Sequence, residues 1–242
     1  MIQRRTKPSR NSLNSIIERS VANGRNSLLE PEAEKLAIGY DIPVVKSGLA
    51  HSERDAVSIS KKLGFPVVLK IVSPDALHKT DVGGVAVNVK SQAAVREAYR
   101  TIVKNTLSSI RSANIVGILV QKMAPSGHEF VVGATRDPQF GPIVMFGLGG
   151  IYVEMFKDVS FRFAPVTQNN SIRMIGELKS HALFSGYRGS GPLDISSTSK
   201  VIVAVGDMIA NHEGIESIDI NPLIVYPRGV VAVDVRVILS KH

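Results

Sequence analysis

The segment VVLKIVSPDALHKTDVGGVAV, residues 67–87, places one histidine and two glycines between two predicted β-strands. Lys70 lies near the end of the first strand, His78 lies in the loop, and Gly83 and Gly84 close it. A lysine at a strand end can direct an ammonium group at phosphate oxygens, and glycines let backbone N–H groups approach them. A histidine ring nitrogen can also accept a phosphoryl group. The segment indicates phosphate chemistry, and a plain hairpin with a surface histidine is the alternative.

A second set of polar residues occurs late in the chain, in SIDINPLIV and VVAVDV. Asp219 and Asn221 alternate along a predicted strand, so their side chains leave the same face. Asp234 follows Asn221 by thirteen positions, beyond a Pro-Arg-Gly turn and in the strand predicted to pair with the first. Carboxylate and amide oxygens suit Mg²⁺, which keeps waters and binds nucleotide phosphates with its other positions. The pattern indicates a magnesium site, with solvent-facing polar residues on an edge strand as the alternative.

The segment VQKMAPSGHEF, residues 120–130, connects an apolar strand to a second strand that carries Glu129. Backbone groups of such a linker could bind the edge of a base, and an acid could reach a ribose hydroxyl. On this segment alone, an ordinary hairpin is the simpler interpretation.

The elements that must position these residues alternate between helix and strand. Helical spacing and end signals predict helices over 28–40, 52–64, 91–110 and 201–212. Apolar and alternating runs predict strands over 42–45, 65–72, 84–89, 115–123, 128–137 and 142–150, with two or three more over 215–239. This order, which contains hairpins as well as crossovers, predicts an α+β or mixed α/β fold rather than a doubly wound sheet. Neither a Rossmann fingerprint nor a Walker A motif occurs, so a nucleotide site would need another architecture.

The composition narrows the class of protein. The chain has 242 residues, a net charge of +8, no cysteine and no tryptophan. The missing cysteines exclude thiolate chemistry and suit a reducing compartment, so we expect a cytoplasmic location. No apolar run reaches membrane-spanning length, and the scarcity of aromatic residues argues against nucleic-acid binding by stacking. Four Arg and Lys residues fall within the first ten positions, and residues 1–27 are predicted to be a poorly ordered basic tail with a short helix around Leu13–Val21.

The order of the motifs is similar to that of the ATP-grasp fold, in which two α+β subdomains hold ATP between them. In detail, SPDALHKTDVGGV, APSGHEFVVGATRDPQFGP and INPLIV resemble the β subunits of ADP-forming acetyl-CoA synthetases, which are relatives of succinyl-CoA synthetase. The resemblance covers about residues 28–238. It implies one subdomain over 28–122, which contains the histidine loop 73–84, and a second over 123–242, which contains the metal site.

The resemblance implies that His78 is transiently phosphorylated and that its loop replaces the usual glycine-rich flap of the fold. Asp219 would orient the imidazole and stabilise its cation. Asn221 and Asp234 would bind Mg²⁺, the implied cofactor. The residues implied to contact ADP or ATP are Lys46, Lys70, Gly83, Gly84, Gln121, Lys122, Met123 and Glu129, and Gly149 and Gly150 would line the phosphate path.

The resemblance also implies a partner. In this family, coenzyme A binding and the acyl-phosphate step belong to an α subunit, so we expect an α2β2 heterotetramer. We expect no binding to nucleic acid or to a membrane. Three alternatives remain at this stage. They are an ATP-grasp carboxylate ligase without a histidine relay, a regulatory nucleotide-binding module, and a nucleic-acid-binding protein whose binding would depend steeply on salt.

Overall fold

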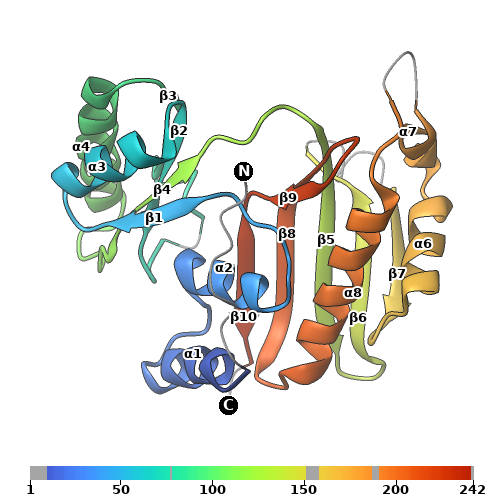
Figure 1. The fold of residues 1–242 in the computed structure, drawn as a ribbon. Helices are drawn as coiled ribbons and strands as arrows, with labels where there is room; N and C mark the ends of the chain where they lie inside the picture. The colour runs from blue at the N-terminus through green and yellow to red at the C-terminus, as the bar shows by residue number, and fades with distance from the viewer. Residues whose placement is uncertain (1–9, 77, 151–157, 187–190, 241–242) are drawn as a thin grey trace. The chain divides into compact units, whose positions relative to one another are not determined.

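The protein is described by a computed structural model that covers residues 10–76, 78–150, 158–186 and 191–240. The chain divides into two compact units (Figure 1). The smaller unit is Val45–Pro125, and the larger combines Met1–Val44 with Ser126–His242. No helix in the described ranges is long and apolar enough to cross a membrane.

The smaller unit is a four-stranded sheet, in the order β1-β4-β2-β3, with two helices on one face (Figure 1). All of its strand pairs are antiparallel. Leu69 and Ile118 belong to the core between the sheet and the helices, and the next residues, Lys70 and Leu119, therefore face away from the helices. The elements are β1 (Ser47–Ala50), α3 (Glu53–Leu63), β2 (Val67–Val72), β3 (Val85–Val89), α4 (Gln92–Ser109) and β4 (Gly117–Lys122).

Serine caps begin both helices of the smaller unit. The Ser52 side chain accepts a hydrogen bond from the Asp55 N–H, and the Ser91 side chain accepts one from the Ala94 N–H. Each cap satisfies a backbone donor that the first helical turn leaves without an intrahelical partner. Both helices were predicted from the sequence, over 52–64 and 91–110.

The larger unit is built on an antiparallel sheet of order β10-β8-β5-β6-β7, with β9 paired to β8. Helices α8 and α6 cover one face (Figure 1). Phe130, Phe146 and Phe184 cluster in the core beneath them. The strands are β5 (His128–Asp137), β6 (Gly141–Leu148), β7 (Val159–Phe163), β8 (Ile215–Val225), β9 (Val230–Ala232) and β10 (Val235–Leu239), and the helices are α1 (Arg10–Ala22), α2 (Glu30–Gly39), α6 (Gln168–Glu177), η1 (Lys179–His181), α7 (Ala182–Ser185) and α8 (Ile195–Asn211).

The N-terminal region differs from the predicted tail. Helix α1 buries Leu13, Ile16 and Ile17 in the core of the larger unit. The Leu28 N–H then donates a hydrogen bond to the Val237 carbonyl of β10. A short helix of polar composition is only marginally stable by itself. The free energy gained by burying three aliphatic side chains stabilises this one.

The observed boundaries also differ from the predicted division at residue 122. Residues 28–44 pack with the larger unit, because α2 places Ala33, Leu36 and Ala37 in its core. The predicted strand over 42–45 is reduced to a single bridge between Val44 and Ala232. Strand β7 and helix α6 have no counterpart in the predicted elements.

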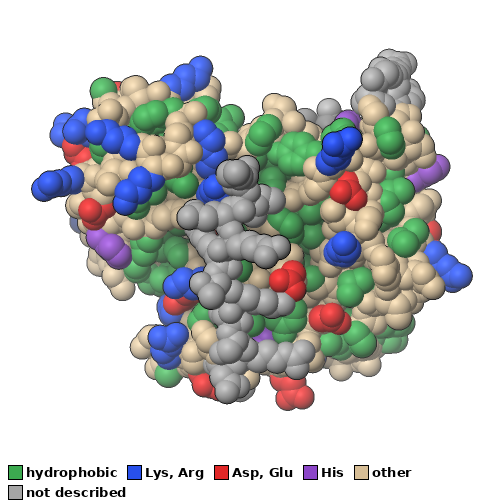
Figure 2. Space-filling view, in the orientation of Figure 1, with side chains coloured by type: hydrophobic (Ala, Val, Ile, Leu, Met, Phe, Trp, Pro, Cys, Tyr) green, Lys and Arg blue, Asp and Glu red, His purple; other side chains and the backbone are tan. Residues whose placement is uncertain are grey.

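The basic charge is concentrated in the smaller unit. The smaller unit contains twelve Lys and Arg against five Asp and Glu, so it accounts for most of the net charge of +8. Figure 2 shows several of these side chains on its surface. The larger unit is therefore close to neutral, and the smaller unit is strongly basic.

Candidate nucleotide and phosphoryl-transfer site

The acidic part of the candidate site is on strands β8 and β10 of the larger unit. In the β8 ladder, Asp219 is opposite Arg236 of β10 on one side and Gly133 of β5 on the other. The Asn221 N–H donates to the Asp234 carbonyl at 3.2 Å. The structure thus brings Asn221 and Asp234 together across the hairpin, as the strand pattern predicts.

The side chain of Asp219 is on the sheet face opposite the core, because its neighbours Ile218 and Ile220 are buried. Partial burial raises the pKa of the Asp219 carboxyl, and the nearby charge of Asp234 raises it further. The positive charge of Arg236 opposes both effects. Although its carboxylate still reaches water, Asp219 is therefore a more basic carboxylate than an isolated surface aspartate.

A shallow, largely apolar depression of about 230 Å³ adjoins Asp219 on this face. Its walls include Gly133, Met145 and Phe161. Gly133 contributes no side chain beside the carboxylate, which leaves space on the sheet at that point. Charges near such walls interact more strongly than charges in open water.

The residues present fit a magnesium ion of the substrate-bridging kind. No group of three or more His, Asp or Glu in the described ranges could hold a metal by itself. Mg²⁺ at nucleotide sites usually takes only one or two carboxylates and completes its shell with phosphate oxygens and waters. Asn221 and Asp234, whose backbones meet across the hairpin, supply one amide and one carboxylate, and these donor types match that set.

Glu129 is the second residue of β5, and it is exposed. Two glycines, Gly149 and Gly150, pass close to it. The Gly149 N–H donates to the Glu129 carbonyl at 2.8 Å, and a Cβ on Gly149 would lie 2.8 Å from the Phe130 carbonyl carbon. Gly150 has a left-handed backbone, and a Cβ there would lie 3.0 Å from Glu129 Oε2. Only glycines can pass this close to Glu129, so the predicted Gly149–Gly150 stretch is positioned directly against a predicted nucleotide contact.

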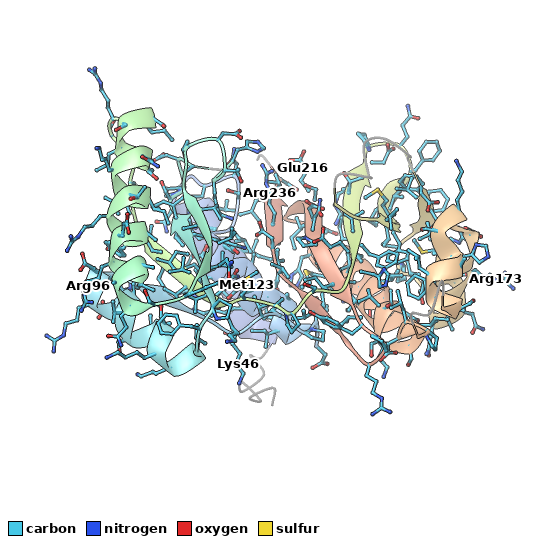
Figure 3. The ribbon with its side chains drawn as sticks, turned by 90° about the horizontal axis from the view of Figure 1, so that it is seen from above. Lys46, Arg96, Met123, Arg173, Glu216 and Arg236 are labelled. Atoms are coloured by element: carbon cyan, nitrogen blue, oxygen red, sulfur yellow. The ribbon has the colours of Figure 1, made fainter. Side chains whose placement is uncertain are left out.

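The smaller unit carries the predicted phosphate and base contacts. Lys70 and Gln121 are buried on the sheet face that points away from α3 and α4. Lys46 and Met123 are exposed at the ends of neighbouring strands, and Figure 3 labels both. The Lys46 carbonyl accepts the Lys122 N–H at 2.8 Å, which joins the start of β1 to the end of β4. Lys46, Lys70 and Gln121 to Met123 are therefore close together in one sheet.

The Lys122 side chain has a structural partner rather than a free end. Its ammonium donates to the carbonyl oxygens of Gly64 at 2.8 Å and Phe65 at 2.9 Å, just beyond the end of α3. A cation is favoured at a helix C-terminus because carbonyl groups point outward there. Any contact of Lys122 with a base would therefore involve its backbone, not its ammonium.

The loop 73–84 carries an exposed His78 between two anchored ends. At the first end, Asp75 Oδ2 accepts the Asn114 N–H at 2.7 Å. At the second end, the Gly84 carbonyl accepts the Ile71 N–H at 2.7 Å. His78 is thus presented to solvent at the tip of a tied loop.

Gly83 and Gly84 have a different role from the predicted one in this conformation. Their N–H groups donate to the carbonyl oxygens of Thr80 and Lys79, so they are engaged within the loop rather than presented to a phosphate. A Cβ on Gly84 would lie 2.5 Å from the Ile71 side chain. The glycines are required by close packing of the loop against β2.

Arg236 is a candidate that the sequence reasoning missed. It follows Asp234 by two positions and is opposite Asp219 in the ladder. The alternation of side chains along a strand was the available signal, since it places residue 236 on the same face as residue 234.

The fold belongs to a known class of α+β domains. The chain belongs to the ATP-grasp family, because a family model described as an ATP-grasp domain matches residues 19–239. The predicted mixed α/β ATP-grasp fold is thereby confirmed.

Among individual relatives, the chain is 46% identical over 224 residues to the β subunit of ADP-forming acetate–CoA ligase I of Pyrococcus furiosus, covering 93% of this chain and 96% of that subunit. It is 39% identical over 233 residues to ADP-forming acetate–CoA ligase I of Archaeoglobus fulgidus, covering 96% of this chain but only 34% of that longer protein. The predicted resemblance to these β subunits is confirmed.

Solved structures agree with this. A dinucleotide-forming acetyl-coenzyme A synthetase 1 of Candidatus Korarchaeum cryptofilum, in complex with coenzyme A and Ca-AMPCP, matches with a TM-score of 0.91 and 48% identity, over 95% of this chain and 100% of that one. A structure of the same protein with Mg-AMPPCP has its phosphohistidine segment pointing towards the nucleotide binding site. It matches with a TM-score of 0.84 and 45% identity over the same shares.

Proposed function

We propose that this chain is the β subunit of an ADP-forming acetyl-CoA (acyl-CoA) synthetase, an acid–thiol ligase. The complete enzyme would convert acyl-CoA, phosphate and ADP to acid, coenzyme A and ATP, reversibly. This chain would carry the nucleotide site and the phosphohistidine step. The observation that carries the proposal is the exposed His78 at the tip of a loop tied at both ends, in a chain closely similar to such β subunits.

In the proposed relay, a ring nitrogen of His78 attacks the γ-phosphorus of ATP. The bond between that phosphorus and the bridging oxygen breaks, and ADP leaves with the electron pair. In the other direction, phosphohistidine gives its phosphoryl group to ADP. A relay of this kind separates the nucleotide step from the acyl step, because the loop carries the group between them.

Asp219 is proposed to hold the imidazole by accepting a hydrogen bond from its second ring nitrogen. Its raised pKa makes it a stronger acceptor, and its negative charge stabilises the cationic ring that forms during transfer. The apolar walls beside Asp219 would limit the access of water, which would otherwise hydrolyse phosphohistidine.

Lys46 and Lys70 are proposed to neutralise the nucleotide phosphates. Backbone groups of Gln121–Met123 would bind adenine, and Glu129 would bind the ribose. The concentration of positive charge in the smaller unit supports this, since it attracts a polyanionic nucleotide.

Asn221 and Asp234 are proposed to hold Mg²⁺ together with the nucleotide phosphates. When bound, the ion would supply charge neutralisation at the phosphoryl group. Their adjacency across the β8–β10 hairpin supports this assignment.

The proposed partner is an α subunit that binds coenzyme A and forms the acyl phosphate, in an α2β2 assembly in the cytoplasm. Support comes from the relatives, since one is named a β subunit, whereas another is a single protein of which this chain matches 34%. The remainder of the longer protein is where the functions of an α subunit would reside.

The test is phosphorylation of the isolated chain with [γ-³²P]ATP and Mg²⁺, followed by acid and base treatment. We expect an acid-labile, base-stable label that disappears in His78→Ala. The matched control is His51→Ala, which removes another exposed histidine of the same unit and should retain the label.

A label that persists in His78→Ala would contradict the relay. So would a chain that binds ATP but stays unlabelled both alone and with the α subunit of the Pyrococcus furiosus relative. Either result would favour a ligase without a histidine step or a regulatory nucleotide-binding module.

A further inference from the structure

Arg236 is a half-buried arginine on β10 whose charge is not matched by an ion pair. It is opposite Asp219 in the β8–β10 ladder, and Figure 3 labels it with Glu216 of the neighbouring strand. Within the part of the chain that the structure describes, its guanidinium donates no hydrogen bond and has no carboxylate within the 4.0 Å of an ion pair. Arg25, Arg100 and Arg162, by contrast, each pair with a glutamate.

Such an arrangement is costly unless an anion completes it. A guanidinium has five N–H donors, and removing it partly from water costs free energy that a paired carboxylate normally offsets. In the described part of the chain, Arg236 gains the through-space attraction of Asp219 across the ladder, but no hydrogen-bonded carboxylate offsets this cost in full. The planar donor fork suits phosphate oxygens, to which arginine often binds through two parallel hydrogen bonds.

The surroundings indicate which anion is suited. Asp219 and Asp234 are the acids close to this point. Burial and the charge of Asp234 raise the pKa of the Asp219 carboxyl, whereas the charge of Arg236 lowers it. A phosphoryl group brought next to two carboxylates would be repelled unless cations were present. A magnesium ion at Asn221 and Asp234 would supply one source of positive charge, and the guanidinium beside Asp219 would supply another.

We propose that Arg236 is a further catalytic residue, whose guanidinium binds the oxygens of the phosphoryl group while it passes between nucleotide and His78. This inference rests on the proposed function and deepens it. The guanidinium keeps its protons throughout the step. Its contribution is greatest in the transition state, when charge is spread over the three non-bridging oxygens.

The experiment compares Arg236→Met, Arg236→Lys and the control Arg228→Met in the full chain. Methionine keeps an unbranched stem in the sheet and removes the guanidinium with its charge and its N–H donors, and Arg228 is an exposed arginine in the turn after β8. Four quantities are measured for each variant. They are the melting temperature, the dissociation constants of Mg-AMPPCP and AMP, and the rate of His78 labelling from [γ-³²P]ATP.

We expect Arg236→Met to lower the labelling rate by about a hundredfold or more, as the loss of one preorganised oxyanion contact does elsewhere. Affinity for Mg-AMPPCP should fall more than affinity for AMP, and the melting temperature should change little. Arg236→Lys should retain part of the rate, and Arg228→Met should match the wild type.

A labelling rate of Arg236→Met within threefold of the wild type would overturn the inference and leave the relay intact. An equal loss of affinity for AMPPCP and AMP, together with a lower melting temperature, would show a purely structural arginine and would also overturn it. If the wild type never labels but its preference for AMPPCP depends on Arg236, the relay fails while the phosphate contact stands.

Discussion

The Asp75 carboxylate accepts a hydrogen bond from the Asn114 backbone N–H at 2.7 Å, across 39 positions of sequence. This bond links the start of the histidine loop to the connection between α4 and β4. The Ser73 hydroxyl accepts the Asp75 N–H at 3.2 Å and shapes the same turn. The loop is thus anchored three residues before His78, which restricts the positions the histidine can reach.

Replacing Asp75 should loosen the loop without affecting nucleotide binding. We expect Asp75→Ala to speed amide hydrogen exchange across residues 73–84 and at Asn114, and to slow His78 labelling several-fold. Asp75→Asn keeps an acceptor oxygen and should fall between Ala and wild type, because hydrogen bonds to charged groups are the stronger ones. Amide hydrogen exchange, followed by mass spectrometry, tests the loosening of the loop. Titration with ATP tests whether nucleotide binding is unchanged.

The control for Asp75 is Asp81→Ala, which removes an exposed acid from the other side of the same loop. It should leave exchange at Asn114 unchanged. If Asp81→Ala slowed labelling as much as Asp75→Ala, the effect would be one of loop charge and not of the anchor.

Gly84 should not tolerate a side chain. A Cβ there would lie 2.5 Å from the Ile71 side chain and 2.8 Å from the Lys79 carbonyl oxygen. Overpacking of this kind costs about 1–3 kcal/mol, so we expect Gly84→Ala to lower the free energy of unfolding of the smaller unit by that amount. Gly176→Ala is the matched control, because a Cβ in that α6 position meets nothing within 4 Å. Urea denaturation measures the free energy of unfolding of both variants. If Gly84→Ala proved as stable as Gly176→Ala, the packing argument would be wrong.

Lys122 should prove a stabilising residue rather than a nucleotide contact. Lys122→Met removes two hydrogen bonds from an ammonium to the Gly64 and Phe65 carbonyls. Hydrogen bonds to charged groups contribute about 1.5–3 kcal/mol each, and partial exposure reduces that, so we expect a loss of about 1–2 kcal/mol in unfolding free energy. The dissociation constant of ATP should stay within about twofold of wild type, as expected for a backbone-only contact. Lys62→Met, an exposed lysine in the last turn of α3, is the control and should change neither value.

A marked loss of ATP affinity in Lys122→Met, at unchanged stability, would contradict this structural assignment. It would indicate that the Lys122 ammonium contacts the nucleotide.

Asp194 should make stability depend on pH in the acid range. As the cap of α8, its carboxylate accepts the Ser197 N–H at 2.9 Å and the Gly229 N–H at 2.8 Å, and these bonds hold its pKa below the ordinary value. A lowered folded pKa means that the stabilisation is present above the unfolded pKa, about 3.9, and is lost as pH falls through the folded pKa. Asparagine can cap the helix but cannot supply charge-assisted hydrogen bonds, so we expect Asp194→Asn to be less stable than wild type by about 1 kcal/mol at neutral pH and equal to it once the Asp194 carboxyl is protonated.

Urea unfolding of Asp194→Asn between pH 7 and pH 3 measures this difference. Glu213→Gln, an exposed acid of the same unit, should keep the wild-type pH dependence. A constant gap between Asp194→Asn and wild type at every pH would show that the charge of Asp194 has no part in the effect.

Local pattern was sufficient to predict the strands that carry the site. Alternation in SIDINPLIV places Asp219 and Asn221 on one face, and the hairpin turn returns Asp234 to Asn221. The lysine strand and the histidine loop were likewise predicted from residues close together in the chain. Capping serines and the glycine after α3 gave helix ends for the same reason, since these signals act within a few residues.

The sequence by itself thus determined most of the helices and strands that carry the candidate residues, together with the ATP-grasp class. Only the tertiary structure decided that α1 and α2 belong to the larger unit, that the Lys122 ammonium closes the end of α3, and that the glycine N–H groups close the loop. It also decided that Arg236 stands opposite Asp219. The physical reason is that burial and hydrogen-bond partners depend on residues far apart in the chain, whereas periodicity and capping depend on near neighbours.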